Sequence, residues 1–255
     1  MSIRIAAVLV LTLSLLGCAS TNEPTVPAKR QMSEFKSPPS GHPIDIYDPL
    51  EKLNRGTYAF NAVFDEYVFL PLVDAYQFIT FDPIEDRISD FFSNLTEISS
   101  FANSMLQLNF ENAGRAASRF FINSTIGLLG FIDIATLANL PQEREDFGQT
   151  LGVWGAGDGP YLVLPILGPS NLRDTTGIVV DALPSALLLP SDVTDDTAYR
   201  VAWYGIRPLD VRKNIAFRYY QTGSPFEYEL VRLLYTQKRA LDIQRSENRA
   251  LNNRR

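Results

Sequence analysis

Histidine and cysteine, from which many catalytic and metal sites are built, are almost absent from this sequence. Its 255 residues include a single cysteine, Cys18, and a single histidine, His42. One cysteine excludes a disulfide framework. One histidine in a proline-rich segment excludes a Ser-His-Asp triad, a Cys-His pair and a metal site of the usual ligand types. We therefore expect neither an enzyme nor a cofactor, although paired carboxylates such as Asp133 and Asp158 stay open as catalytic groups.

Charge is scarce in the middle of the chain. Residues 147–191 contain four charged side chains, against 48 in the rest of the sequence. So apolar a stretch must be buried in protein or in lipid, but its five prolines interrupt it too often for one transmembrane helix. Irregular backbone in apolar surroundings is tolerated where protein packs around it or where it lines a cavity. The one short strand candidate, Tyr161–Leu164, is disfavoured by the prolines that flank it.

The charge balance is uneven along the chain. The formal net charge is −6, which argues against a nucleic-acid-binding protein. Residues 212–255 nevertheless carry ten basic and four acidic side chains. This asymmetry is typical of a tail that meets an acidic partner or an anionic lipid surface, and also of a solvated helix face. We expect residues 244–255 to form a disordered basic tail.

Residues 1–17 have the features of a lipoprotein signal peptide. Arg4 precedes an apolar run, residues 5–16, that is too short to span a membrane stably. The run ends in Leu15-Leu16-Gly17-Cys18, which resembles the bacterial lipobox. The resemblance implies that Cys18 is acylated and becomes the first mature residue, and Ala19 after it implies sorting to the outer membrane. Each buried acyl methylene contributes about 0.8 kcal/mol, so several chains would anchor the protein permanently.

The mature chain divides into a tether and a helical domain. Prolines and polar residues fill residues 18–46, which is typical of a semi-extended tether without a core of its own. Residues 47–243 form the domain, in which apolar residues recur at helical spacing and no segment alternates convincingly with period two. Three helix starts combine a capping residue, a proline and a glutamate that could close a capping box. They are Asp48–Glu51, Asp82–Glu85 and Ser224–Glu227. The fold class is therefore mainly α.

A cluster of glycines marks the start of the central stretch. Its members are Gly148, Gly152, Gly155, Gly157 and Gly159, and they lie beside Trp154 and Tyr161. Glycine permits positive φ and close approach of the backbone. One interpretation is a tight turn between helices. The other is a mobile hairpin that lines an opening, with Trp154 and Tyr161 at a lipid–water boundary, where amphipathic rings are favoured. We favour the hairpin because its flanks have so little charge.

Longer motifs behind the lipobox follow one another in a fixed order. They are Asp48-Pro49-Leu50-Glu51 with Asn54-Arg55, Arg119-Phe120-Phe121-Ile122-Asn123, Gly127 to Asp133, Glu145 to Gly152, Gly159 to Pro165, and Ser170 with Leu172-Arg173-Asp174. Together they resemble the MlaA (VacJ) family of outer-membrane phospholipid-transport lipoproteins. The matching motifs extend over residues 48–190.

This resemblance implies a fold, a place and a function. The fold is a ring-like bundle of amphipathic helices embedded in one membrane leaflet, with a Gly/Pro-rich apolar hairpin. The place is the periplasmic leaflet of the outer membrane. Family members associate with trimeric porins, remove phospholipids that have strayed into the outer leaflet, and pass them to a soluble periplasmic carrier protein. This maintains outer-membrane lipid asymmetry, and no catalytic residue is carried over.

A lipid-transfer protein must shelter acyl tails beside a wet path for the head group. A phospholipid has about 30 acyl methylenes, and exposing them all to water would cost roughly 25 kcal/mol. We expect residues 147–169 to line such a path. The candidate residues are Phe147, Gly148, Gly152, Trp154, Gly155, Gly157, Gly159, Tyr161 and Leu164. The alternatives are a structural or assembly lipoprotein that holds porins without moving lipid, and a membrane-surface lipid hydrolase.

Overall fold

The structure, a computed structural model, describes the backbone of residues 46–188 and 191–252, and the side chains in these ranges except those of residues 183–188 and 252. The predicted signal peptide (residues 1–17), Cys18 and the tether up to residue 45 lie outside the described residues. Within the described ranges the chain is mainly helical, which confirms the predicted fold class. None of the helices in these ranges is long and apolar enough to cross a membrane.

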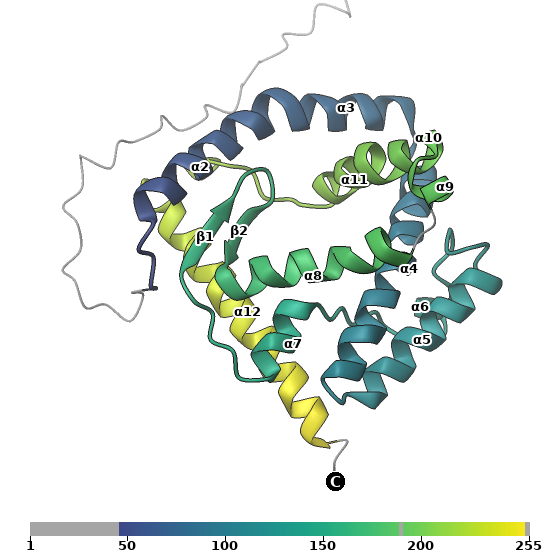
Figure 1. Cartoon of the computed structure of the whole chain (residues 1–255). Helices are drawn as coiled ribbons and strands as arrows, with labels where there is room; N and C mark the ends of the chain where they lie inside the picture. The colour runs from purple at the N-terminus through teal and green to yellow at the C-terminus, as the bar shows by residue number, and fades with distance from the viewer. Residues whose placement is uncertain (1–45, 189–190, 253–255) are drawn as a thin grey trace, which may run out of the picture.

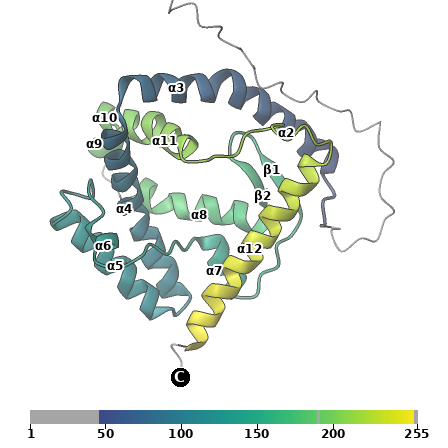
Figure 2. The same cartoon turned by 180° about the vertical axis from the view of Figure 1, so that it is seen from behind.

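Long helices follow the perimeter of the molecule (Figures 1 and 2). They are α2 (Glu51–Phe64), the π-helical segment η2 (Asp65–Phe69), α3 (Leu70–Ile79), α4 (Asp82–Leu106), α5 (Phe110–Thr125) and α12 (Glu227–Asn252). The first three form one continuous rod, and α4 and α5 pack against each other as a helical hairpin. The C-terminal helix α12 runs along the side of the molecule opposite α5 (Figure 1).

The remaining elements are shorter, except for α8. They are α6 (Ile134–Leu137), α7 (Phe147–Val153), β1 (Tyr161–Leu164), β2 (Gly168–Asn171), α8 (Leu172–Leu188), α9 (Ser191–Thr194), α10 (Thr197–Arg200), the π-helical segment η3 (Val201–Ile206) and α11 (Arg207–Lys213). The hairpin, α8 and α11 lie inside the perimeter formed by the long helices (Figures 1 and 2). There α7 packs on α8 and α12, and α11 packs on α3 and α4.

The two strands form an antiparallel hairpin, which the sequence analysis disfavoured. Tyr161 is in register with Asn171, and Leu164 with Gly168. The flanking prolines at 160 and 165 stand just outside β1, so they remove no ladder hydrogen bond from within it. In a sheet of only two strands, both strands are edges, where proline is accepted. The prediction against a strand was therefore wrong.

The predicted helix starts lie close to the observed ones, but the predicted capping boxes do not form. Neither α2 nor α4 has a side-chain cap. Asp48 instead accepts hydrogen bonds from Asn54 (2.7 Å) and from the hydroxyl of Tyr228 (2.6 Å). Glu227 accepts one from the hydroxyl of Tyr58 (2.7 Å). Through the two tyrosines these carboxylates join segments far apart in the sequence, and those contacts replace the cap, which would contribute roughly 1 kcal/mol.

Both π-helical segments directly precede a helix with a proline near its start. Pro71 follows η2 in α3, and Pro208 follows η3 in α11. A proline within a helix has no N–H to donate, and its ring clashes with the carbonyl four residues earlier. A local π turn lets the neighbouring backbone groups find other partners. The helical rod therefore continues through each proline.

Aromatic side chains form the apolar core where α2, the hairpin and α12 meet. Tyr58, Tyr161 and Tyr228 are 2–4% exposed. The ring of Tyr228 contacts the rings of Tyr58 and Tyr161 edge to face, with centroids 5.7 and 6.2 Å apart. Such aromatic pairs contribute about 0.5–1.5 kcal/mol beyond the area that they bury. The core therefore fixes the hairpin to both long helices.

The C-terminal helix extends further than expected. Because α12 ends at Asn252, residues 244–252 are helical, and the prediction of a disordered tail is wrong over that range. Ser246 is buried, and its hydroxyl lies 2.9 Å from both carboxylate oxygens of Glu145. This contact fastens the end of α12 to the segment just before α7.

Candidate lipid-contacting surface and polar interior

The interior of the described part of the chain is polar, and much of its outside is apolar. Among the residues whose burial is described, 27 buried residues are polar or charged and 11 are hydrophobic, whereas 41 large hydrophobic residues are exposed. Single exposed apolar residues are normal, but a buried polar majority is not, because Asp, Glu and Arg are almost never fully buried unless paired. The distribution is the reverse of the one expected for a protein with an apolar core.

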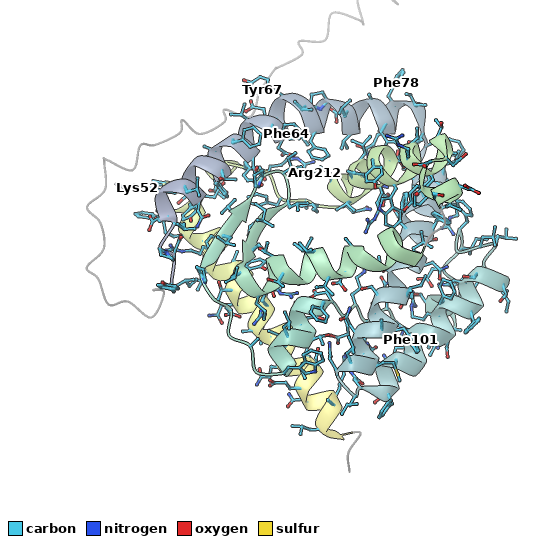
Figure 3. All side chains as sticks on the ribbon, viewed as in Figure 1. Lys52, Phe64, Tyr67, Phe78, Phe101 and Arg212 are labelled. Atoms are coloured by element: carbon cyan, nitrogen blue, oxygen red, sulfur yellow. The ribbon has the colours of Figure 1, made fainter. Side chains whose placement is uncertain are left out.

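The rod formed by α2, η2 and α3 has an apolar outer face. Leu53, Phe60, Val63 and Tyr67 are 51–70% exposed, and their spacing places them along one side of the helix. On α3, Phe78 is 91% exposed. Figure 3 shows Tyr67 and Phe78 pointing away from the rest of the molecule. Rings and aliphatic chains therefore cover the outer edge of this rod.

Three further apolar side chains stand on turns in strained backbone. Leu128, Leu129 and Ile166 have φ of 53°, 61° and 67° and are 49–71% exposed. The left-handed conformation costs a residue with a Cβ roughly 1–2 kcal/mol. Glycine would avoid this cost, so the chain presents apolar side chains at these turns although the backbone is strained.

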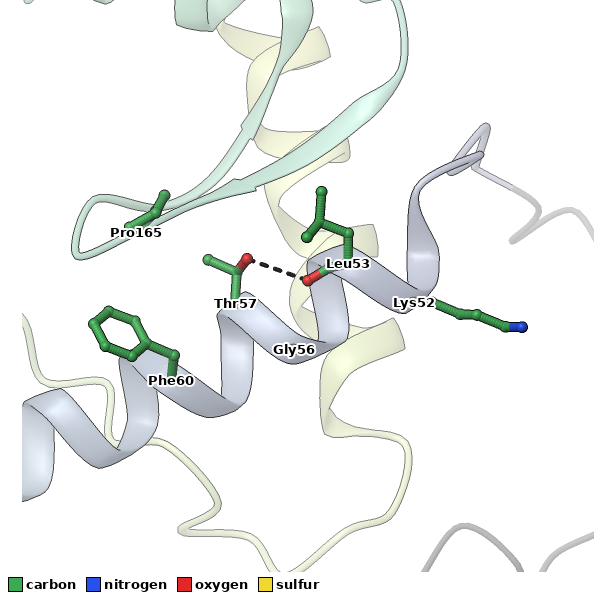
Figure 4. A pocket seen from close by; sticks show the side chains of 6 residues that line it. All are labelled: Lys52, Leu53, Gly56, Thr57, Phe60 and Pro165. Carbon is green, nitrogen blue, oxygen red and sulfur yellow. Dashed lines mark hydrogen bonds between the residues drawn. The ribbon is translucent and has the colours of Figure 1, made fainter.

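An open hollow of about 420 Å³ lies between α2 and the tip of the hairpin (Figure 4). Its lining is formed by Lys52, Leu53, Gly56, Thr57, Phe60 and Pro165. The hydroxyl of Thr57 donates to the carbonyl of Leu53 (3.1 Å), which leaves the hollow mostly apolar. Leu53 and Phe60 therefore turn this end of the apolar side of the rod toward the tip of the hairpin (Figure 4).

Inside the protein, one arginine joins α4, α5 and α6. Arg119 is 2% exposed, and its Nε donates to Glu97 (2.5 Å) and its Nη2 to Asp133 (2.9 Å). Burial raises the pKa of Glu97, although hydrogen bonding to Arg119 and its charge oppose the rise. Burial also acts to raise the pKa of Asp133, but hydrogen bonds from Thr136 and Arg119 lower it to about 2. This cluster is a buried ion-pair network.

A second arginine network joins α12 to the starts of α7 and α8. Arg239 donates to Asp146 (2.8 Å) and to Asp174 (2.8 Å). Arg173 donates to Asp174 (2.9 Å) and to Asp158 (2.5 Å), which lies in the glycine-rich loop. Burial acts to raise the pKa of Asp174, but hydrogen bonding to Arg239 and its charge bring it below the ordinary value. The glycine-rich loop is therefore fastened to the first turn of α8.

The predicted glycine hairpin is in fact a short helix and a loop. Gly148 and Gly152 belong to α7, where an added Cβ would lie 2.6 Å from Asp174 or from Ile243. These two glycines allow α7 to pack closely on α8 and α12, so the prediction of a mobile hairpin is wrong for them. Gly155 and Gly157 follow in the loop, with no atom within 4 Å of an added Cβ.

The other predicted path residues fall in different environments. Tyr161 is buried in the aromatic core, so its predicted place at a lipid–water boundary is wrong. Trp154 is 55% exposed, its Nε1 donates to the carbonyl of Leu106 (3.2 Å), and its ring contacts Phe147. Leu164 ends β1.

Gly159 precedes the strand, with φ of 67° and a Cβ position 3.0 Å from that of Leu172. No single lined path is formed by all nine candidate residues in the described structure, because Tyr161 and the glycines of α7 are packed inside it.

The carboxylates considered as a catalytic pair belong to two different ion pairs. Asp133 pairs with Arg119, whereas Asp158 pairs with Arg173, so the two carboxylates proposed as a pair have separate partners. No group of three or more His, Cys, Asp or Glu residues in the described part could hold a metal ion.

Two features of the sequence were missed. Residues Asp146 and Gln149 form a complete capping box at the start of α7, and an aspartate followed three residues later by glutamine is its known signature. The second feature is a polar stripe on α4. Asn94, Glu97 and Ser104 are all buried, at helical spacing. A search for polar rather than apolar periodicity would have found this stripe.

Comparison with known proteins places these features in a family. The family model for the MlaA lipoprotein matches residues 46–242. An uncharacterized protein of Rickettsia felis is 43% identical over 54% of this chain and 55% of its own length, so the chain spans about half of that relative. The MlaA lipoproteins of the intermembrane phospholipid transport systems of Shigella flexneri and Haemophilus influenzae are 35% and 32% identical. Their alignments cover 72% and 83% of this chain, and 67% and 78% of those proteins.

A solved structure shows the same fold. It is described as the structural basis for maintenance of bacterial outer membrane lipid asymmetry, is 30% identical, and has a TM-score of 0.61 over 78% of this chain and 100% of its own. These matches confirm the resemblance drawn from the motifs, and the family match covers well over half of the residues. The chain belongs to the MlaA lipoprotein family.

Proposed function

We propose that this protein removes mislocalised phospholipids from the outer leaflet of the outer membrane and passes them to a soluble periplasmic carrier, which maintains lipid asymmetry. Two relatives are named as lipoproteins of an intermembrane phospholipid transport system, and the similar solved structure concerns outer-membrane lipid asymmetry. The observation that carries the proposal is the polar interior beneath an apolar outer surface. A protein that contacts lipid needs an apolar outer surface, and its charged groups are then favoured inside it, where they can pair with one another.

We place the helical domain in the periplasmic leaflet, anchored by acyl chains on Cys18. Moving a half-exposed large apolar side chain from water into lipid contributes about 1 kcal/mol. If about a third of the 41 exposed side chains met lipid, they would contribute on the order of 10 kcal/mol. Acyl chains would add about 0.8 kcal/mol for each buried methylene. The domain and the anchor would then both hold the protein in the membrane.

The proposed lipid path follows the inner side of a ring-like bundle, with residues 147–169 as part of its wall. Tyr161 and the glycines of α7 support this wall from within. Trp154 is 55% exposed, and an added Cβ at Gly155 or Gly157 would meet no atom within 4 Å, so this part of the wall has room to contact lipid. Ile166 and Leu167, at the tip of the hairpin, are also exposed and would extend the apolar part of this wall. Tails would lie against these apolar groups, and the head group would follow the polar interior.

Trimeric porins and the soluble carrier are the protein partners that this function implies. The hollow beside α2 and the exposed side chains of the rod offer an apolar surface for a membrane-embedded partner such as a porin. The carrier would have to meet the protein on its water-facing side to receive lipid.

The test is the phospholipid content of the outer leaflet in cells that lack the gene. Accumulation on deletion, reversed by the wild type, supports the proposal. Cys18→Ala, which lacks the acylation site, should reverse it less well than the wild type, and full reversal by this variant would mean that the helical domain alone holds the protein in the membrane. Gly157→Pro should restore protein abundance but not lipid removal, whereas Gly157→Ala, whose Cβ meets no atom within 4 Å, should behave as wild type. No accumulation on deletion would contradict the proposal.

The second candidate function is a structural lipoprotein that holds a porin assembly without moving lipid. The apolar outer face favours it as well, because that face would serve a protein contact equally. Single cysteines introduced at Gly157 and at Phe78 separate the two functions. Labelling of both by a lipid-soluble reagent supports a lipid path inside the protein, whereas labelling at Phe78 alone supports the scaffold.

A further inference from the structure

We propose that Arg207 and Arg144 bind the phosphate of a phospholipid head group. The inference rests on the proposed function and deepens it, because it names the side chains that would hold the transported lipid at its polar end. It begins with two guanidinium groups that have no carboxylate partner among the described residues.

Most arginines in the described part of the chain are neutralised by carboxylates. Ten of fourteen form ion pairs, including the buried Arg119 and Arg239. The four that form none with a described carboxylate are Arg144, Arg200, Arg207 and Arg218. Arg218 donates instead to the backbone carbonyls of Ile215 and Phe217, and Arg200 is exposed. Arg207 differs from both, because it is half-buried and lies against an aromatic ring.

Arg207 is held on an aromatic ladder. Tyr199, Trp203 and Arg207 follow one another at intervals of four along the helical run from α10 through η3 to α11. The guanidinium carbon lies 4.3 Å from the centroid of the Trp203 ring, which stacks on Tyr199 at 5.9 Å and 9°. Trp203 also contacts Phe92 of α4 edge to face. The ladder therefore holds the guanidinium against a ring that is itself packed on both Tyr199 and Phe92.

Arg144 supplies a second positive charge nearby. It lies in the segment that leads from α6 to α7, where its Nε donates to Gln142 (3.0 Å) and its Nη2 to the hydroxyl of Ser93 (3.3 Å). Burial lowers the pKa of Arg207; Tyr199 opposes this lowering, and the charge of Arg144 adds to it. Like charges repel each other, and here one of them, Arg207, is half-buried while Arg144 is exposed. A bound anion would remove that repulsion.

A phosphodiester fits this arrangement best. The guanidinium fork matches the spacing of phosphate oxygens and binds them bidentately. The rings of Trp203 and Phe92 offer apolar contact to the glycerol and upper acyl groups next to such a phosphate. The π-helical segment that carries Trp203 agrees with this role, because π turns within helices occur frequently at functional sites. Free inorganic phosphate offers the same acceptor oxygens, so the experiment compares its binding with that of a phospholipid.

The chain provides its own reporter for the experiment. It has two tryptophans, Trp154 and Trp203, so Trp154→Phe leaves the ring beneath Arg207 as the only indole. The purified full chain with this change, in non-ionic detergent, is titrated with short-chain phosphatidylglycerol while tryptophan fluorescence is recorded. Parallel titrations use inorganic phosphate and a short-chain diacylglycerol without phosphate.

We expect phosphatidylglycerol to change the fluorescence and bind more tightly than either comparison ligand. Arg207→Gln should weaken its binding about tenfold or more, as expected for loss of a charge-assisted hydrogen bond. Arg144→Gln should weaken it in the same direction, and Arg207→Lys should fall between, because lysine keeps the charge but not the fork. Arg200→Gln, an exposed arginine on the same helical run, is the control and should bind as the parent does.

Several results would overturn the inference. They are unchanged affinity in both Arg207→Gln and Arg144→Gln, equal binding of the diacylglycerol, or equal binding of inorganic phosphate, which would indicate a free-anion site. Circular dichroism checks the fold, and the exposed Arg144 carries the test if the Arg207 variant does not fold. If deletion of the gene leaves the outer leaflet unchanged, the proposed function fails, but the titration still decides whether these arginines bind phospholipid.

Discussion

Replacing Arg119 by methionine is expected to destabilise the protein more than any surface change on the same helix. Arg119 and Glu97 are 2% and 1% exposed, and methionine would leave the carboxylate of Glu97 buried without its main partner. Removing one member of a buried ion pair costs about 3–5 kcal/mol, because the remaining charge cannot be solvated. In a protein of this size, each kcal/mol lowers the melting temperature by about 2–4 °C, so the expected fall is roughly 6–20 °C.

The matched control is Arg115→Met, one turn earlier on α5. Arg115 pairs with Glu111 and Glu143, but its side chain is 23% exposed and that of Glu111 is 62% exposed. A pair as exposed as Arg115–Glu111 contributes about 0–1 kcal/mol. Glu143 is only 21% exposed, but it keeps Arg249 as a second partner when Arg115 is replaced. Thermal unfolding of the detergent-solubilised chain, followed by far-ultraviolet circular dichroism, compares the two variants. Equal melting temperatures for both variants would refute the reasoning, because the burial of Arg119 would then have no energetic consequence.

The pH dependence gives an independent check on the same variant. Burial already holds the pKa of Glu97 above its ordinary value near 4.5, and Arg119 opposes that rise. Without Arg119 the pKa must rise further. A carboxyl group with a raised folded-state pKa binds its proton more tightly in the folded state, so it destabilises the fold as the pH rises above the ordinary value. The difference between Arg119→Met and wild type should therefore be largest near pH 7 and smaller near pH 4, and a constant difference would contradict the assignment to Glu97.

Two other predictions concern packing and charge around α8. Gly177→Ala should cost about 1–3 kcal/mol, because its Cβ would lie 2.4 Å from the backbone nitrogen of Gly148, whereas Gly114→Ala, in open space on α5, should stabilise the helix by about 0.5–1 kcal/mol; thermal unfolding of both variants checks this. Asp174→Asn should lower the melting temperature at neutral pH and have less effect below about pH 3.8. Because the folded state lowers the pKa of Asp174, its ionised carboxylate stabilises the fold at pH values above its ordinary pKa, and this stabilisation is lost as the pH falls through the lower folded-state pKa. A difference in melting temperature between Asp174→Asn and wild type that grows in acid would contradict this assignment.

Local sequence patterns predicted the helices well and the roles of individual residues less well. Apolar spacing and the Asp-Pro and Ser-Pro motifs located the starts of α2, α4 and α12 to within a few residues. The capping boxes did not form, because Asp48 and Glu227 bond to residues more than 100 positions away in the sequence. Within the described part of the chain, the Ser224 hydroxyl accepts only the backbone N–H of Phe226 (3.2 Å). Local pattern cannot reveal such competition. For the same reason, Tyr161 could be recognised as amphipathic but not as part of the aromatic core.

The polar interior has a physical explanation in the environment proposed for the protein. In water, helices pack together because apolar surface is removed from solvent. In lipid this force is absent between helices, since acyl tails are as apolar as leucine, and association depends on close packing and on hydrogen bonds between helices. Arg119, Arg212 and Arg239 each donate hydrogen bonds to a carboxylate on another element, and Gly148, Gly152 and Gly177 allow close approach. Figure 3 shows Arg212 on the inner side of the helices, opposite the outward Tyr67. Ion pairs and close packing at small residues therefore hold the helices together where the hydrophobic effect does not. The large apolar side chains are then left on the outside, where they can contact lipid.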